Sequence, residues 1–139
     1  RVAVMYGGKI VETAPTAALF RTTRHPYTSA LLASIPRLEN EPHSRMPVIP
    51  GLPRPVIDPV GCTFARRCPR AQPKCLVKAP PLKGSNPRHL YACWFPTGTA
   101  EGDTAEARNL AAGSTATGLA LGNGLHDPVD VAVTTGVRA

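Results

Sequence analysis

Large apolar side chains are scarce in this sequence of 139 residues. It contains three Phe, three Tyr and one Trp, so aromatic residues make up only 5% of the chain. Much of the 42% hydrophobic content comes from Ala and Val, which bury little area per residue. The length suits one ordinary domain, but the core of that domain must be thin. Domains with thin cores usually need an additional cross-link, which disulfides or a bound metal can supply.

The sequence also lacks any run of about 20 apolar residues, the length that a membrane-spanning helix requires. Its first residues, RVAVMYGGKIVE, alternate in character and do not form the apolar core of a signal peptide. Without an export signal, cysteines are interpreted as thiols or metal ligands of a reducing compartment before they are interpreted as disulfides. Because the first residue is not Met and already lies inside an alternating pattern, we expect the chain to begin partway through a larger protein.

Acidic residues are few and unevenly placed. Residues 1–96 carry 14 Lys and Arg against four acids, whereas residues 97–139 carry two Arg against five acids, giving net charges of +10 and −3. A basic segment can indicate a nucleic-acid partner. This one lacks both an amphipathic basic helix and aromatic residues interleaved with Arg as stacking platforms. We therefore expect no direct binding to nucleic acid.

Two regular motifs are predicted before the proline-rich part of the chain. Residues 1–12 should form a β-hairpin, because Gly7-Gly8 separates two β-rich runs and tolerates the positive φ of a tight turn. A short helix should begin with Pro15 at its first helical position and end near Arg21, and a second should run from Pro26 to Pro36. His25 is expected to cap the second helix. The fold class is therefore α+β with little regular structure.

Proline dominates the middle of the chain, where 13 of the 16 prolines fall between Pro36 and Pro96. Proline fixes φ and removes a backbone donor, so this segment cannot be mostly helix or central strand. We expect an extended, polyproline-like chain anchored through the apolar pairs at 48–49 and 56–57. Residues 97–139 contain many small residues and no aromatic, so we expect a mostly disordered tail with a weak helix over 104–112.

All four cysteines lie between Gly61 and Trp94, at the spacing Cys-x5-Cys-x6-Cys-x17-Cys. Structural zinc sites most often include a tight Cys-x2-4-Cys pair, and none is present. An iron–sulfur cluster is larger than a single ion and can take its ligands from wider loops. The spacing therefore favours a cluster over zinc, with two disulfides or four free thiols as further alternatives. The candidate ligands are Cys62, Cys68, Cys75 and Cys93.

The same segment holds seven basic residues and no acid. A [4Fe–4S] cluster or a zinc ion with four thiolates is a dianion, so positive neighbours should stabilise it and lower the thiol pKa values. Those neighbours are Arg66, Arg67, Arg70, Lys74, Lys78, Lys83 and Arg88. We do not expect a cysteine nucleophile, because no acid near His89 or Cys93 orients the imidazole.

Several motifs in order give the chain a family resemblance. YGGKIVE, HPYTSALLASIP, VIPGLPRP and GCTFARRCPRAQPKC with a closing CW resemble the C-terminal part of the ATP-binding subunits of oligopeptide and dipeptide ABC importers. The resemblance covers residues 1 to about 96. It implies that 1–21 end an α/β P-loop ABC ATPase domain with its edge hairpin, that 22–96 form a C-terminal extension, and that 97–139 are a disordered tail. It further implies that the four cysteines ligate a [4Fe–4S] cluster, with zinc as the alternative.

The resemblance also limits what this chain can do. It has no Gly-x4-Gly-Lys-Ser/Thr phosphate loop, ABC signature, Asp-Glu strand end or switch histidine, all of which would lie upstream of Arg1. We therefore expect no catalytic residue and no ATP-binding residue here, with ATP and Mg²⁺ bound only in the parent subunit and no activity of the fragment alone.

The resemblance implies partners and a location as well. The parent is expected to work at the cytoplasmic face of the plasma membrane as a peripheral subunit, with a second ATPase subunit and transmembrane permease subunits. There it would couple ATP hydrolysis to peptide uptake. The alternative is a free-standing zinc or iron–sulfur interaction module that could contact nucleic acid.

Overall fold

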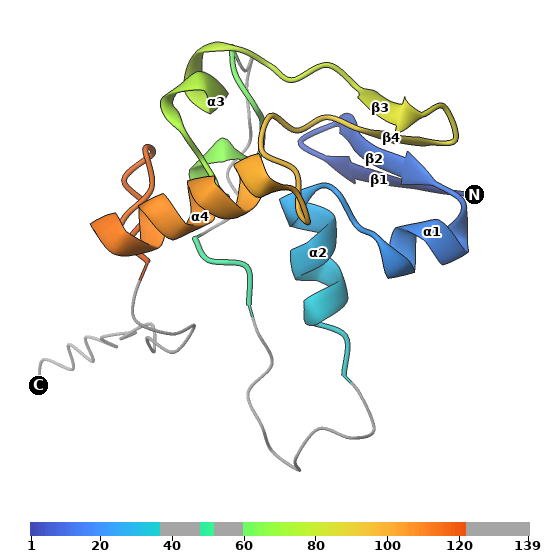
Figure 1. Ribbon diagram of the computed structural model, residues 1–139, viewed down its shortest axis with the longest axis horizontal. Helices are drawn as coiled ribbons and strands as arrows, with labels where there is room; N and C mark the ends of the chain where they lie inside the picture. The colour runs from blue at the N-terminus through green and yellow to red at the C-terminus, as the bar shows by residue number, and fades with distance from the viewer. Residues whose placement is uncertain (37–47, 52–59, 122–139) are drawn as a thin grey trace, which may run out of the picture.

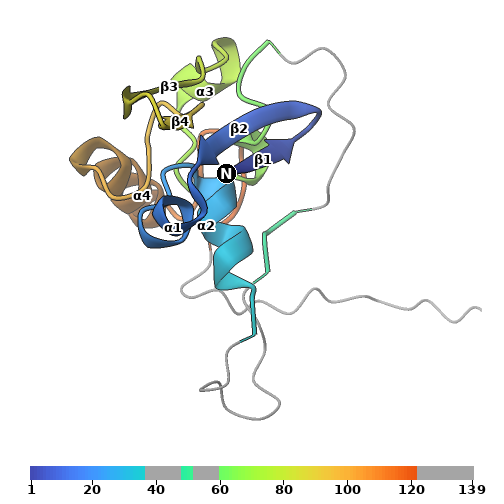
Figure 2. The same cartoon turned by 90° about the vertical axis from the view of Figure 1, so that its right-hand side faces the viewer.

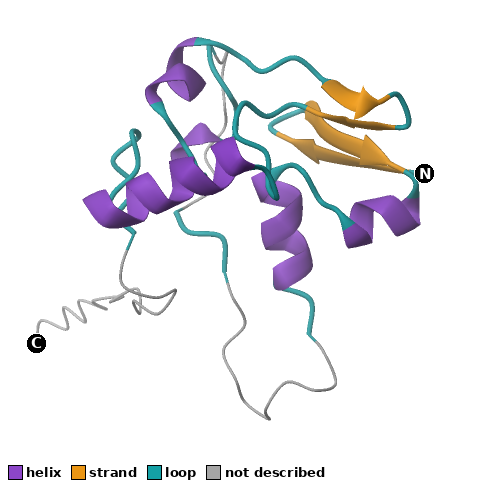
Figure 3. Ribbon diagram, in the orientation of Figure 1, coloured by secondary structure: helices purple, strands orange, loops and turns teal. Residues whose placement is uncertain are grey.

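The computed structural model describes residues 1–36, 48–51 and 60–121, and the predicted α+β class is confirmed (Figures 1 and 3). Figure 1 shows the strands at one end of the molecule and α3 and α4 toward the other. The elements in chain order are β1 (Val2–Tyr6), β2 (Lys9–Ala14), α1 (Thr16–Arg21), α2 (Pro26–Ala33), the 3-10 turn η1 (Ala65–Arg67), α3 (Pro73–Val77), β3 (Lys83–Asn86), β4 (His89–Tyr91) and α4 (Ala100–Ala112).

The four strands form one antiparallel sheet in the order β1-β2-β4-β3. The predicted hairpin of β1 and β2 is confirmed, and Gly7 and Gly8 take φ values of 55° and 76° at its turn. The β3–β4 pair was not expected, since the sequence KGSN of β3 has low β-propensity. Pairing of Glu12 with Tyr91 joins the cysteine-bearing segment to the hairpin. The division of the chain at residue 21 stays a prediction.

Both predicted helices are present. α1 ends at Arg21 as expected but begins at Thr16, with Pro15 as its N-cap instead of its first helical residue. α2 begins at Pro26 in the first helical position. His25 caps α2 as predicted, because its ring Nδ1 accepts a hydrogen bond from the Tyr27 backbone N–H at 3.1 Å. α2 ends at Ala33, short of the predicted Pro36. Figure 2 shows α2 pointing away from the sheet, and Leu31 beyond its first turn is exposed.

A small aromatic cluster forms the centre of the core. Phe64, which is 1% exposed, packs at ring-centroid distances of 5.0 Å from Tyr6 and 5.3 Å from Tyr27. It thereby joins the end of β1, the start of α2 and the segment that carries the cysteines. Ile49 packs on the same cluster, as expected, but Val48 is 73% exposed, so only one residue of the 48–49 pair is anchored. The 56–57 pair lies outside the described residues, as does most of the proline-rich segment.

The expectation of disorder beyond residue 97 is wrong for the residues described there. α4 spans Ala100–Ala112, so it is longer than the weak helix predicted over 104–112, and Gly113 ends it with φ 69°. The prediction failed because it weighed apolar area alone, whereas polar contacts hold this helix to the rest of the chain. The rest of the predicted tail, 122–139, lies outside the described residues. Among the described helices, none has the length and apolar character needed to cross a membrane.

Candidate functional site

The four cysteines line a single cavity, here called the cysteine cavity. Cys62 precedes η1, Cys68 follows it, Cys75 lies in α3 and Cys93 follows β4. The fold therefore brings Cys62 and Cys93, which are 31 positions apart in the sequence, to the same cavity. The predicted four-thiol site requires this. The rest of the lining comprises His25, Pro26, Phe64, Ala65, Arg70, Pro80, Trp94 and Phe95.

Backbone hydrogen bonds fix the loops that carry the thiols. The Cys62 N–H donates to the Cys75 carbonyl at 2.8 Å, which ties the first cysteine to the third. Gly61 makes this approach possible, because a Cβ there would overlap the carbonyls of Cys75 and Leu76. The Cys68 N–H donates to the Ala65 carbonyl at 3.2 Å. The loops around the cavity are thus ordered by the chain's own backbone.

The thiols converge without forming a pocket for one ion. All four are free cysteines. Within residues 1–36, 48–51 and 60–121, no group of three or more His, Cys, Asp or Glu side chains could hold a metal ion. A tetrahedral zinc site needs its sulfur atoms at about 2.3 Å from one centre. The cysteines thus share a cavity but do not have the close spacing of a preformed zinc site.

Burial controls the acidity of the thiols, contrary to the expectation from basic neighbours. It raises the pKa of Cys62 and of Cys75, and it raises the pKa of Cys68 well above its usual range. It also raises the pKa of Cys93 to about 12. Positive charge acts in the opposite direction only through Lys74 on the pKa of Cys75 and Arg70 on the pKa of Cys93. The metal-free site therefore holds neutral thiols at pH 7.

Several of the basic side chains make other contacts, which limits their influence on the thiols. Arg67 donates to the carbonyls of Ile49 and Pro50 at 3.0 and 2.9 Å. Three ammonium groups gather instead around the Trp94 ring, at 3.9, 5.8 and 6.0 Å from its centroid. These belong to Lys74, Lys78 and Lys83.

Glu12 is a residue of the site region that the sequence did not single out. It is 0% exposed, and its carboxylate accepts hydrogen bonds from the backbone N–H groups of Arg24 and His25 at 2.8 and 3.0 Å. Nε2 of His89 lies 2.7 Å from the same carboxylate. Glu12 thus links β2, the start of α2 and β4 behind the cysteine cavity. Strand alternation gave no sign of this, because a polar residue in a hairpin normally faces water.

His25 should make the fold sensitive to acid. Burial lowers its pKa from 6.5 to about 4, against smaller opposing effects of Glu12 and of a hydrogen bond with the Ala92 backbone. Because the folded-state pKa is the lower one, its contribution is complete above pH 6.5 and is lost as the pH falls from 6.5 toward 4. The loss amounts to about 3 kcal/mol, measurable by urea unfolding at several pH values.

The matched variant for this pH dependence is His25→Asn, whose side-chain oxygen can still cap α2. It should flatten the profile of unfolding free energy between pH 6.5 and 4, because the titrating imidazole is gone. The other acid-sensitive groups remain, so some slope is left. Parallel profiles for the two proteins would show that His25 is not the titrating group.

Known proteins match part of this chain. The family "Oligopeptide/dipeptide transporter, C-terminal region" matches residues 11–75. A probable peptide ABC transporter ATP-binding protein of Sinorhizobium fredii is 47% identical over 95 residues, which cover 68% of this chain and 28% of that protein. The peptide transport system ATP-binding protein SapD is 44% identical in Escherichia coli over 100 residues, covering 69% of this chain and 29% of SapD. SapD of Salmonella typhimurium is 43% identical over the same shares.

The chain thus spans less than a third of the length of these relatives. The matched residues 11–75 contain the Glu12 carboxylate, the capped start of α2 and three of the four cysteines. The agreement between the family match and the order of the motifs settles the relationship: the chain belongs to the oligopeptide/dipeptide transporter C-terminal region family.

Proposed function

We propose that this chain is the C-terminal segment of the ATP-binding subunit of an oligopeptide or dipeptide ABC importer. The observation that carries the proposal is the 43–47% identity to ATP-binding proteins of peptide transport over 95–100 residues. In the whole protein, ATP hydrolysis would drive peptide uptake with a second ATPase subunit and transmembrane permease subunits. The subunit would be peripheral, at the cytoplasmic face of the membrane. Residues 1–21 would end the nucleotide-binding domain, and 22–96 would form its extension.

This proposal is tested in the source cells. Disruption of the gene should abolish uptake of labelled dipeptides or oligopeptides, and the intact gene should restore it. Unchanged uptake of both peptide classes would contradict the assignment. The chain by itself should not hydrolyse ATP, because it carries no phosphate loop.

We further propose that Cys62, Cys68, Cys75 and Cys93 hold a [4Fe–4S] cluster. The donor set supports this, since four thiols from separate segments line one cavity. In such a cluster each thiolate binds a different iron, so the sulfur atoms need to converge without crowding one centre. The bound group would cross-link the cysteine-bearing segments, which makes its role structural.

The chain's own residues set the conditions for loading this site. The four thiols are protonated at pH 7, so ligation must release protons, and loading becomes more favourable as the pH rises. Lys74 and Arg70 are the cations that offset part of the negative charge of the thiolates. Phe64, Trp94 and Phe95 in the cavity wall restrict water.

Metal analysis of anaerobically purified protein tests the cluster. We expect a brown chain with about four irons and four sulfides, the content of one [4Fe–4S] cluster. Replacing any one of the four cysteines by Ser should remove most of the iron and lower thermal stability. Thr63→Ser, a change of similar size next to Cys62, serves as the control and should retain the iron. A colourless chain with one zinc would rule out the cluster.

A further inference from the structure

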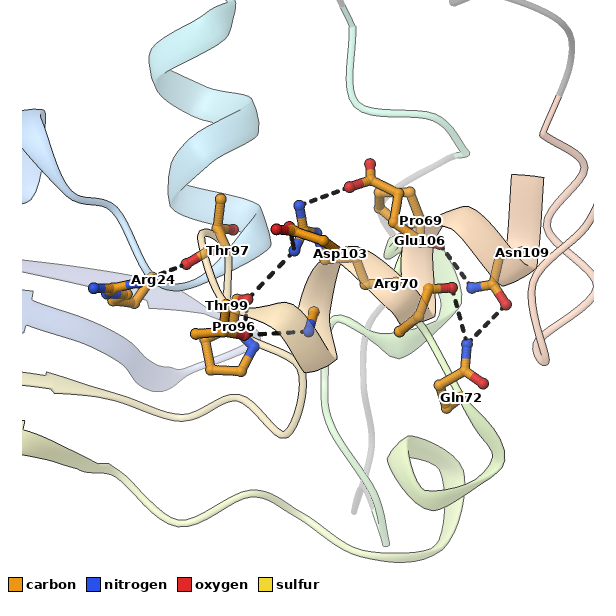
Figure 4. Close-up of polar contacts among 12 residues, drawn as sticks. Arg24, Pro69, Arg70, Gln72, Pro96, Thr97, Thr99, Asp103, Glu106 and Asn109 are labelled. Carbon is orange, nitrogen blue, oxygen red and sulfur yellow. Dashed lines mark hydrogen bonds and ion pairs between the residues drawn. The ribbon is translucent and has the colours of Figure 1, made fainter. Parts of the chain in front are cut away.

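α4 is joined to the cysteine-bearing chain by one buried arginine. The guanidinium of Arg70 donates from Nη1 to Asp103 Oδ1 at 3.1 Å and from Nη2 to Glu106 Oε2 at 2.6 Å (Figure 4). The same Nη1 also donates to the Pro96 carbonyl at 3.3 Å. Arg70 lies two residues after Cys68 and lines the cavity, while Pro96 lies three residues after Cys93. One side chain therefore connects α4 with two of the four thiol-bearing segments.

A second set of contacts holds the loop between Cys68 and Cys75. Nδ2 of Asn109 donates to the carbonyls of Pro69 and Ala71 at 2.7 and 3.0 Å. Nε2 of Gln72 donates to Oδ1 of Asn109 at 2.8 Å (Figure 4). Asn109 and Gln72 are only 5% and 7% exposed, so these bonds lie away from water. Each buried group that loses its partner there carries a desolvation cost.

The start of α4 is fixed at a third point. Nη1 of Arg24 donates to the carbonyls of Thr97 and Gly98 at 3.0 and 2.9 Å, and the Thr97 N–H donates to the Arg24 carbonyl at 2.8 Å. Arg24 directly precedes His25, which lines the cysteine cavity. Gly102 lies so close to Pro96 and Arg70 that no Cβ could be accommodated.

We infer that residues 96–112 act as a clamp on the cysteine cavity, with Arg70 as its positioning residue. The clamp holds the 68–75 loop, the chain after Cys93 and the start of α2 in one arrangement, so the metal-binding unit extends beyond the closing Cys-Trp motif to Ala112. Its effect on thiol exposure is independent of any metal. Its effect on metal retention rests on the proposed function.

The first test uses the reduced, metal-free chain and a thiol alkylating reagent, with labelling at each cysteine followed by mass spectrometry. Glu106→Gln and Asn109→Ala should each label Cys68 and Cys93 about tenfold faster than the unaltered chain, because local opening becomes easier. The controls lie on the exposed face of the same helix. Glu101→Gln makes the same change of charge as Glu106→Gln, and Thr104→Ala is a comparable truncation. Both should leave the labelling rates within about twofold.

The second test measures release of iron to a chelator from the chain after anaerobic reconstitution. The two clamp variants should lose iron about tenfold faster than the controls, in parallel with their labelling. Equal labelling and equal iron release in all variants would overturn the clamp while leaving the cluster intact. Faster labelling in a chain that binds no iron would support the clamp and overturn the cluster.

Glu106→Gln keeps the test decisive if Asn109→Ala proves unable to fold. The Glu106 side chain is 35% exposed, so its replacement removes an ion pair without opening a hole in the core. Glu106→Asp should label Cys68 and Cys93 more slowly than Glu106→Gln does, because a carboxylate remains on the same turn. If α4 were purely structural and had no influence on the cavity, the variants would lose helix content while Cys93 was alkylated at an unchanged rate.

Discussion

Replacement of Glu12 by Gln should lower the free energy of unfolding by about 2–4 kcal/mol, since it alters the fully buried carboxylate at the centre of a polar network. An amide retains one acceptor oxygen, but its NH₂ group would face a backbone N–H of Arg24 or His25, both of which are donors. His89 would then face a neutral amide in place of the carboxylate. Urea unfolding followed by far-UV circular dichroism measures the change.

His89→Asn provides the comparison, because it disturbs only one of the three contacts of the carboxylate. It should cost less than Glu12→Gln, and the double variant should cost less than the sum, since the two residues share a contact. Stability of Glu12→Gln equal to that of the original chain would show that the network is not a structural centre.

Replacement of Gly61 by Ala should have an effect of similar size, about 2–4 kcal/mol, because the new Cβ would overlap backbone that belongs to α3. The hydrogen bond from Cys62 to Cys75 must then lengthen, which separates two of the four thiols. Trp94 is the only tryptophan and lines the cysteine cavity, so its fluorescence should change as well. If the proposed cluster is present, iron content should fall together with stability.

Gly8→Ala is the matched control for this glycine. Gly8 has φ 76° and nothing within 4 Å of the added Cβ, so the substitution costs only backbone strain of about 1 kcal/mol. It should leave Trp94 fluorescence and iron content unchanged. If the two alanine variants behaved alike, close packing at Gly61 would not be what keeps the first and third cysteines together.

Local patterns in the sequence were sufficient to predict the elements near the start of the chain. A Gly-Gly turn between alternating runs and a Pro at a first helical position act through neighbouring residues, so the hairpin, α1 and the cap at His25 are confirmed. The convergence of the four cysteines in one cavity is likewise consistent with their interpretation as one site. That a group binds there, and which group it is, remain predictions.

The missed features depend on residues far apart in the sequence. Glu12 is buried because β4 pairs with β2 in the sheet, and nothing in the local pattern of either strand indicates that pairing. α4 is held by Arg70, Gln72 and Asn109, and a composition argument based on apolar area cannot detect such contacts. Basic residues beside the cysteines were expected to lower thiol pKa values, but most of them bind carbonyls, acids or the Trp94 ring, and burial dominates.

The pairing of β2 with β4 has a consequence for how the chain is made. Glu12 and His89 are 77 residues apart, so at about 5–20 residues per second the ribosome needs about 4–15 s to supply the partner. During that interval the hairpin can close, but β2 has no β4 beside it and the carboxylate of Glu12 stays hydrated. An unpaired edge is a place where nascent chains associate with one another. Pairing of β4 with β2 removes such an edge only after residues 89–91 have been made.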